Sequence, residues 1–394
     1  MERRLFDTTY YVGACDRTKI LFENLFPVPK GMRYNSYIIK DEKTALLDTA
    51  DEAVSEEFLE NVKDTLKERS LDYLVVHHAE PDHSALVMRV LEIYPSAKLV
   101  TGVQALKYLN QFTGCDLSAR TQTVKDGDVL NLGKRSLTFI SAPMVHWPEV
   151  MVSYDKETKT LFSADAFGSF GCCEGSLFIS NLNHTEEWES EARRYYSNIV
   201  GRFGVNVSAL LKKAEKLEID NILPLHGLVF DRDCNFAINK YLKWSSYEAE
   251  TDDVLIVYGS MYQNTKKAVE ILSCNLFEKG KNSKIIDVSY TDFSYIISDI
   301  FKYKNIVFAC PTYYGGIFPR MEQLLNLVKK TCVKDRKIYL LENGTWAPTA
   351  AKNMIDLLSD LKADICENKI TIKSACDSET ISQLKSLAEV ISDC

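Results

Sequence analysis

One short segment concentrates side chains that bind metal ions. Residues 77–83 read His-His-Ala-Glu-Pro-Asp-His and contain three of the six histidines of the chain. They follow the apolar run 73–76, which is typical of a buried strand. Side chains two residues apart lie on one face of an extended backbone, so His78, Glu80 and Asp82 can converge. Imidazoles clustered with carboxylates indicate a metal site.

Four further residues of the same types stand near predicted strand ends or helix starts. His83 begins the helix after the segment and can point back toward it, and the others are His146, Asp165 and His226. With the first three they make four imidazoles and three carboxylates. One tetrahedral zinc ion takes four ligands, so this set suits two metal ions bridged by a carboxylate.

Other histidines and tyrosines fall outside this pattern. His77 alternates to the face opposite His78, so we expect it beside the metal ligands or at the surface rather than as a ligand. His184 is expected to be structural or to stand beside a helix start. Tyr195 lies in a predicted helix, where its phenol could donate a proton to a reaction or could pack in the core.

Composition excludes several classes of protein. The chain has 394 residues, a net charge of −8 and 11 cysteines. No apolar stretch approaches the ~20 residues of a membrane helix, and the acidic balance argues against nucleic acid as a partner. No secretory leader is evident, so we expect reduced thiols and a cytoplasmic location. No two cysteines are spaced C-x-x-C, which excludes zinc ribbons and rubredoxin-type iron sites.

The order of predicted elements divides the chain near residue 250. In residues 1–250 short strands precede a long helical stretch, 188–217, which predicts two sheets with helices outside, an αββα sandwich. In residues 251–394 apolar strands alternate with helices, which predicts a doubly wound parallel sheet. Its expected strands are 254–258, 284–289, 305–310, 337–341 and 369–372, and its expected helices are 265–278, 321–329, 350–361 and 378–391.

The metal pattern H-x-E-x-D-H, followed by His, Asp and His, resembles the metallo-β-lactamase fold. Hydrolases of that fold usually carry histidine where this chain has Glu80, and an anionic oxygen ligand there favours iron over zinc. Glutamate at this position, together with a flavodoxin-like second domain, resembles the flavodiiron proteins, also called A-type flavoproteins. The resemblance implies that His78, Glu80 and His146 bind one iron, that Asp82, His83 and His226 bind the other, and that Asp165 bridges them.

The resemblance extends to three loops at predicted strand ends in the second domain. Residues 260–265 put hydroxyls at a helix start, where anions bind, and resemble the flavodoxin phosphate loop. Residues 311–316 and 342–347 resemble the loops that contact the flavin ring, although Gln263 and Glu342 depart from the family pattern. The residues implied to bind FMN are Ser260, Met261, Asn264, Thr265, Pro311, Thr312, Tyr313, Gly315, Asn343, Gly344 and Trp346.

The resemblance implies an oxidoreductase that reduces O2 to water, NO to N2O, or both, at a non-haem diiron centre fed by FMN. The ligand set does not separate the two substrates. The two domains fill the chain and leave no room for an electron-input module, so we expect the minimal two-domain form with an external donor such as rubredoxin. The family also implies a head-to-tail homodimer, or a tetramer of such dimers.

Two other functions compete with this interpretation. A dizinc β-lactamase-fold hydrolase with an accessory flavodoxin domain would contain zinc instead of iron. A flavin-only electron carrier with an inactive metal site would not consume O2 or NO, and the seven intact ligand-type residues argue against it.

Overall fold

A computed structural model describes residues 3–172, 175–183, 185–366 and 368–393. Its contacts divide the chain into two compact units. The first unit comprises Met1–Tyr196 and Phe203–Leu242, and the second comprises Ser197–Arg202 and Lys243–Cys394. Among the described residues, no helix is both long and apolar enough to cross a lipid bilayer.

The first unit is built on two sheets. One has the order β1-β2-β7-β8-β9-β10-β11 and the other β12-β13-β14-β15-β16. The strands of the first sheet are β1 (Arg3–Phe6), β2 (Thr9–Tyr11), β7 (Tyr37–Lys40), β8 (Thr44–Leu47), β9 (Tyr73–Val75), β10 (Lys98–Gly102) and β11 (Thr121–Val124). Those of the second are β12 (Val129–Asn131), β13 (Ser136–Ser141), β14 (Met151–Asp155), β15 (Thr160–Phe162) and β16 (Asn221–Leu223). Two small ribbons pair β3 (Ala14–Asp16) with β6 (Met32–Tyr34) and β4 (Leu21–Phe22) with β5 (Phe26–Pro27).

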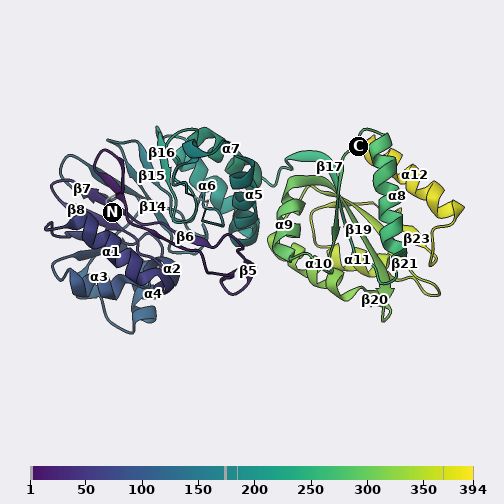
Figure 1. Cartoon of the computed structure of the whole chain (residues 1–394), viewed down its shortest axis with the longest axis horizontal. Coiled ribbons are helices and arrows are strands. Elements are labelled where there is room, and N and C mark those ends of the chain that lie inside the picture. The colour runs from purple at the N-terminus through teal and green to yellow at the C-terminus, as the bar shows by residue number, and fades with distance from the viewer. Residues whose placement is uncertain (1–2, 173–174, 184, 367, 394) are drawn as a thin grey trace. The chain divides into compact units, whose positions relative to one another are not determined.

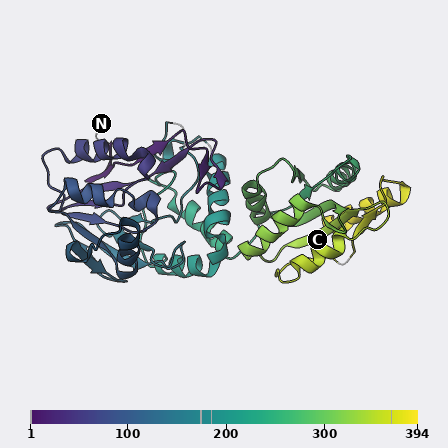
Figure 2. The same cartoon turned by 90° about the horizontal axis from the view of Figure 1, so that it is seen from below.

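The two sheets pack face to face, and helices lie outside them (Figure 1, Figure 2). One buried cluster joins Tyr37 and Val100 of the first sheet to Phe139 and Phe162 of the second. Burial of such apolar side chains is the main force that holds sheets together. The helices are α1 (Ser55–Leu66), α2 (Pro81–Ser84), α3 (Val87–Ile93), α4 (Val103–Thr113), α5 (Glu186–Tyr195), α6 (Gly204–Ala214) and α7 (Cys234–Ser245). This arrangement is the predicted αββα sandwich.

The helical stretch expected over 188–217 is present but broken. Helix α5 ends at Tyr195, a π-helical turn covers Tyr196–Val200, and a 3-10 turn covers Gly201–Phe203 before α6 begins. Two glycines within four residues, Gly201 and Gly204, weaken helix propagation at this point. Apolar periodicity continues across the break, which is why the sequence alone did not reveal it.

The second unit has one largely parallel sheet in the order β18-β17-β19-β21-β22, with β20 on β19 and β23 on β21. Its strands are β17 (Thr251–Tyr258), β18 (Ser283–Asp287), β19 (Tyr303–Tyr313), β20 (Gly316–Ile317), β21 (Lys337–Asn343), β22 (Asp364–Ile365) and β23 (Ile370–Ile372). Helices cover both faces of this sheet (Figure 1). They are α8 (Asn264–Glu278), α9 (Phe293–Lys302), α10 (Pro319–Thr331), α11 (Ala350–Leu358) and α12 (Ser378–Ser392).

This topology is the predicted doubly wound sheet, with the strand order of flavodoxins. All five strands expected from the sequence are present, and helix α9 is an addition. Its sequence, Phe-Ser-Tyr-Ile-Ile-Ser-Asp-Ile-Phe-Lys, is rich in β-branched and aromatic residues, so local propensity did not favour a helix. Burial of Ile296, Ile297 and Ile300 overrides that propensity.

The side chain of Glu342 points into the protein and ties three elements together. It is fully buried in β21, and its oxygens accept hydrogen bonds from the Ala351 N–H at 2.9 Å and the Thr371 hydroxyl at 2.9 Å. Lys369 pairs with it at 2.8 Å. Burial favours a higher pKa for Glu342, but these contacts outweigh it and lower the pKa. This residue, unusual for a flavin loop, therefore has a structural role.

Replacing Glu342 should destabilise the protein in a pH-dependent way. The pKa of a glutamate in an unfolded chain is about 4.3, and that of Glu342 is lower in the folded chain. The carboxylate therefore stabilises the fold above about pH 4.3, and this contribution is lost as the pH falls below that value. We expect Glu342→Gln to lower the free energy of unfolding by about 1–3 kcal/mol at pH 7 and by less at pH 3. Denaturant titrations measure both values, with the exposed Glu278→Gln as the control. An equal loss at both pH values would contradict this account.

Candidate functional site

The ends of four strands bring the seven predicted ligands together in the first unit. His78 and Glu80 lie in the loop after β9, and Asp82 and His83 lie in α2, which starts with Pro81. His146 follows β13, Asp165 follows β15, and His226 follows β16. The first of these strands belongs to one sheet and the other three to the second sheet. The cluster therefore depends on the packing of the two sheets.

Four of the seven form one group. His78, Glu80, His146 and Asp165 each offer a ligand atom, and these atoms lie within 4.8 Å of one another. Glu80 Oε2 is 3.0 Å from His78 Nε2 and 3.1 Å from His146 Nε2. Asp165 Oδ2 is 3.3 Å from each of the same two nitrogens. This spacing leaves room for an ion at the centre of the group.

Asp82, His83 and His226 form a second group, and their ligand atoms also lie within 4.8 Å of one another. Asp82 Oδ2 lies 3.2 Å from His226 Nε2 and 3.4 Å from His83 Nε2. Asp165 reaches this group with its other oxygen, since Oδ1 is 3.1 Å from His83 Nε2 and 3.6 Å from His226 Nε2. One carboxylate thus faces both groups with one oxygen each, which is the arrangement of a bridging ligand.

Outer partners fix the orientation of two of the imidazoles. Glu149 Oε1 lies 2.7 Å from His78 Nδ1, and the Arg33 carbonyl lies 2.8 Å from His226 Nδ1. With Nδ1 engaged, each ring presents Nε2 to the cluster. Asn35 supports His226 further, because its Nδ2 donates to the carbonyls of Pro224 and Gly227 on either side of it. The sequence did not single out Glu149, although an acidic residue after Trp-Pro in a buried stretch was a usable signal.

The electrostatics of the cluster are dominated by its carboxylates. Burial lowers the pKa of His83 and His146. This effect is outweighed by Asp82 and Asp165 at His83, and by Asp165 and Glu80 at His146, so both pKa values rise to about 9. Burial raises the pKa of Asp165, yet His83 and the other imidazoles hold it well below its usual range. In the absence of a metal, protons on the imidazoles therefore balance the buried carboxylates.

The donor set fits two metal ions. Among the described residues, both oxygens of Asp82, both oxygens of Asp165 and the Nε2 atoms of His83 and His226 are buried without a hydrogen bond. Buried polar atoms of this kind are costly unless something binds them. Three carboxylates and four imidazoles supply nitrogen and oxygen donors to divalent or trivalent ions and offset their charge.

His77 lies outside both groups, and its environment is now defined. It is buried, which excludes the surface position that the sequence left open. Its Nδ1 lies 2.6 Å from Asp48 and its Nε2 lies 2.8 Å from the Ser153 hydroxyl. These contacts join strand β8 to β14 next to the ligand loop, so His77 supports that loop. His184 lies outside the described residues.

Tyr195 lies against the second group. Its ring is buried, 5.6 Å from the His226 ring and 5.2 Å from the Phe170 ring. Burial, followed by the negative charge of Asp165, raises its pKa well above the usual range, so the phenol keeps its proton. Phe22, from the β4–β5 ribbon, packs edge-on to the same histidine at 5.4 Å. Tyr195 therefore lies beside the second group of ligands, and its role as proton donor stays a prediction.

In the second unit, the predicted flavin loops surround a cavity of about 450 Å³. The loops follow β17, β19 and β21, at the carboxyl edge of the parallel strands, where open α/β sheets bind ligands. Ten of the eleven predicted residues line it: Ser260, Met261, Asn264, Thr265, Pro311, Thr312, Gly315, Asn343, Gly344 and Trp346. Tyr313 does not. Tyr314 lines the cavity instead, at the turn before β20, with a φ of 49°.

The start of helix α8 forms one end of this cavity. Its backbone N–H groups and the Ser260 and Thr265 hydroxyls are suited to a phosphate group. Gln263 precedes the helix with a φ of 68°, a left-handed conformation that glycine adopts most easily. This chain reaches that conformation with glutamine.

Exposed aromatic rings surround the cavity. Tyr262, Tyr314 and Trp346 are 83%, 95% and 90% exposed, although all three line it. A planar ligand would cover such rings, since stacking buries large apolar surfaces. Tyr262, Thr345, Ala347 and Ser374 were not predicted as lining residues. The first three adjoin predicted ones, but Ser374 comes from the segment after β23, which carried no sequence signal.

Both domains match known families. Residues 32–227 match the family described as "ODP family beta lactamase", and residues 256–386 match the family described as "Flavodoxin". The predicted resemblance of the first domain to the metallo-β-lactamase fold and of the second to flavodoxin is therefore confirmed.

Similar proteins match this chain over four fifths or more of their length. A protein named nitric oxide reductase from Moorella thermoacetica is 33% identical over 81% of this chain and 80% of its own length. The structure of rubredoxin oxygen:oxidoreductase from Desulfovibrio gigas covers 100% of this chain and 98% of its own, with a TM-score of 0.93 and 27% identity. That of the flavodiiron protein from Giardia intestinalis covers 100% and 96%, with a TM-score of 0.93 and 25% identity. The chain belongs to the flavodiiron protein family.

Proposed function

We propose that this protein reduces O2 to water, NO to N2O, or both, at a diiron centre in the first unit, with FMN in the second unit supplying electrons. The observation that carries this proposal is the shared Asp165 carboxylate, which faces two buried groups of ligands with one oxygen each. Among the described residues, its two oxygens and several donor atoms of the second group lack hydrogen-bond partners. Family membership favours this function over a dizinc hydrolase. The cofactors are FMN and two iron ions.

Each ligand has a defined place in this proposal. His78, Glu80 and His146 hold one iron, Asp82, His83 and His226 hold the other, and Asp165 bridges them. Glu80 contributes the anionic oxygen that favours iron over zinc at the first position. Glu149 and the Arg33 carbonyl keep the rings of His78 and His226 oriented with Nε2 toward the cluster.

The cofactors supply the redox chemistry. Two irons that exchange one electron each, and a flavin that exchanges two, store the four electrons that reduction of O2 to two waters needs, while reduction of two NO to N2O and water needs two. The chain contributes position and protons. Tyr195 keeps a protonated phenol beside His226, and the apolar rings of Phe22 and Phe170 limit water around it.

Partners and location follow from the same proposal. Electrons come from an external carrier, for which rubredoxin is our first candidate.

The exposed rings around the flavin cavity support a head-to-tail homodimer, or a tetramer of dimers, in which a partner subunit covers these rings. Analytical sedimentation measures the oligomeric state. The described cysteines are all free thiols, which supports a cytoplasmic location. The functional division into residues 1–250 for the metals and 251–394 for the flavin stays a prediction.

The decisive experiment supplies the protein with reduced rubredoxin under anaerobic conditions and then adds O2 or NO separately. We expect about two irons per chain and consumption of at least one gas, to water or to N2O. His226→Ala should abolish this turnover and lower the iron content, while its FMN content stays that of the native protein. Zinc in place of iron together with esterase activity would contradict the proposal, and so would retained turnover in the variant.

The phenol of Tyr195 can be tested separately from its ring. Tyr195→Phe keeps the ring contacts with His226 and Phe170 but removes the proton. If the phenol supplies a proton, turnover should fall about 100-fold while iron and FMN contents stay unchanged. Tyr154→Phe is the matched control, because that hydroxyl bonds the Glu218 carbonyl away from the cluster. Unchanged turnover in Tyr195→Phe would assign this residue to packing.

The phosphate end of the flavin cavity is tested by removing a hydroxyl. Thr265→Val keeps the side-chain volume at the start of α8 but loses a hydrogen bond to a charged group. We expect FMN affinity, measured by fluorescence quenching, to fall about 10- to 100-fold. The control is Thr380→Val, a buried threonine in the first turn of α12 that does not line the cavity. Equal FMN affinity in both variants would place the phosphate elsewhere.

A further inference from the structure

A cavity in the first unit is bordered by charged side chains that have no part in the proposed reaction. Its volume is about 760 Å³. None of the described residues that line it is one of the seven predicted metal ligands, and none lines the flavin cavity. Pockets of about 300–1,000 Å³ hold small organic molecules. The cavity is therefore large enough for a ligand of its own.

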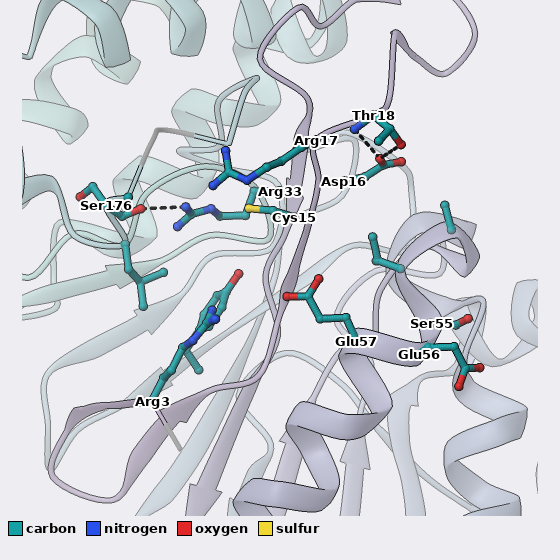
Figure 3. A pocket seen from close by; sticks show the side chains of 15 residues that line it. Arg3, Cys15, Asp16, Arg17, Thr18, Arg33, Ser55, Glu56, Glu57 and Ser176 are labelled. Atoms are coloured by element: carbon teal, nitrogen blue, oxygen red, sulfur yellow. Dashed lines mark hydrogen bonds between the residues drawn. The ribbon is translucent and has the colours of Figure 1, made fainter. Parts of the chain in front are cut away.

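Three arginines from different elements border this cavity (Figure 3). Arg3 lies in β1, Arg17 follows β3, and Arg33 lies in β6. Arg33 is only 6% exposed, and its Nη2 donates to the Cys172 carbonyl at 2.6 Å and to the Ser176 carbonyl at 2.7 Å. These carbonyls are neutral, so they hold the guanidinium in place without cancelling its charge. The cavity therefore offers several positive groups to an anionic ligand.

The acidic side chains on the cavity wall differ in their contacts. Asp16 Oδ1 accepts hydrogen bonds from the Thr18 N–H at 2.9 Å and the Thr18 hydroxyl at 2.8 Å, and Glu56 pairs with Arg89 at 2.8 Å. Within the part of the chain that the structure describes, the Glu57 side chain has no ion pair or hydrogen bond. Figure 3 shows it extending from α1 into the cavity. Glu57 is therefore the carboxylate that remains available to a cationic group.

Two further polar groups on the wall have no partner among the described residues. Tyr11 is only 3% exposed, and its hydroxyl makes no hydrogen bond there. The Cζ of Arg3 lies 5.9 Å from the centre of the Tyr11 ring, next to that hydroxyl's own side chain. The Arg17 side chain makes neither an ion pair nor a hydrogen bond. A buried hydroxyl without a partner is unfavourable, so an occupant that bonds it would stabilise this wall.

These charges specify the chemistry of the ligand. Three guanidinium groups face one available carboxylate, so a ligand with two carboxylates and one ammonium group matches the cavity in sign and in number. Val54 and Leu177 add apolar surface for the carbon skeleton between the charges. A single amino acid would leave much of the volume to water, whereas a short peptide would occupy more of it.

We propose that this cavity binds a short acidic peptide with a free amino terminus. One carboxylate of the peptide lies against Arg17 and Arg33, and the other lies against Arg3. The ammonium group lies against Glu57, and the Tyr11 hydroxyl donates to the peptide. Binding rests on charge-assisted hydrogen bonds and involves no covalent step.

The test measures binding of the dipeptide alanyl-glutamate to the holoprotein by isothermal titration calorimetry at pH 7 and low salt. This probe has two carboxylates and one ammonium group. N-acetyl-alanyl-glutamate lacks the ammonium group, and alanyl-glutamine lacks one carboxylate. Because each removes one charge-assisted contact, we expect both to bind about 10- to 100-fold more weakly than alanyl-glutamate.

Variants assign the charges of the peptide to the cavity wall. Glu57→Gln should weaken binding of alanyl-glutamate and abolish its advantage over the N-acetyl peptide. Arg17→Gln should instead reduce its advantage over alanyl-glutamine. The matched controls are Glu60→Gln, an exposed position of α1, and Arg232→Gln, because neither residue lines the cavity. Thermal unfolding and FMN content show that each variant is folded.

Cys15 lines the same cavity and reports its occupancy. Saturating alanyl-glutamate should slow the reaction of Cys15 with iodoacetamide at least about threefold, measured by mass spectrometry of peptides. Cys115, an exposed cysteine, should react at an unchanged rate.

Three results would overturn the proposal. Absence of alanyl-glutamate binding at millimolar concentration would show that the cavity does not take this class of ligand. Equal affinities for the three peptides would show that the charged wall does not select among them. Binding that leaves Cys15 unprotected, or that is unchanged in both cavity variants, would place the peptide elsewhere on the protein.

Discussion

The rest of the first unit depends on one buried carboxylate. Asp165 is inaccessible to solvent, and its two oxygens face two different groups of imidazoles at 3.1–3.6 Å. A carboxylate in such a position is unfavourable unless positive charge surrounds it on both sides. Protonated imidazoles or bound metal ions can supply that charge, and only metal ions also satisfy the donor atoms that lack hydrogen bonds among the described residues. The loop after β15 therefore has to place Asp165 beside the ligands that follow β9, β13 and β16.

Hydrogen bonds to the far side of the imidazole rings show how the fold keeps the histidines directed at Asp165. Glu149 orients His78, and the carbonyl of Arg33 orients His226. Arg33 also donates from its guanidinium to the Cys172 carbonyl, so strand β6 contacts both the ligand cluster and the segment around Cys172. The chain of Asp48, His77 and Ser153 plays a similar supporting role, because it connects the first sheet to the second next to the ligand loop.

Local sequence patterns predicted the parts of the site that lie close together in the chain. The segment 77–83 carries its ligands within one turn and one loop, so their spacing alone indicated a metal site. The parallel strands of the second unit were predictable because buried strands are continuously apolar, as 254–257 is. The assignment of His146, Asp165 and His226 to particular groups needed the family resemblance, since no local rule relates them to the distant segment 77–83.

Residues missed by the sequence reasoning have their partners at long range or depend on backbone conformation. Ser374 reaches the flavin cavity from the segment after β23. Tyr313 and Tyr314 are adjacent and chemically identical, and only the turn at Gly315, with φ of 72°, decides which of them lines the cavity. Glu342 looked like an unusual flavin ligand because its loop lies at the cavity. Its side chain instead turns inward to Ala351 and Thr371, since side chains of a strand alternate between two faces. Gln263 and Glu342 therefore differ in their structural setting, a left-handed backbone at one and an inward-facing strand position at the other.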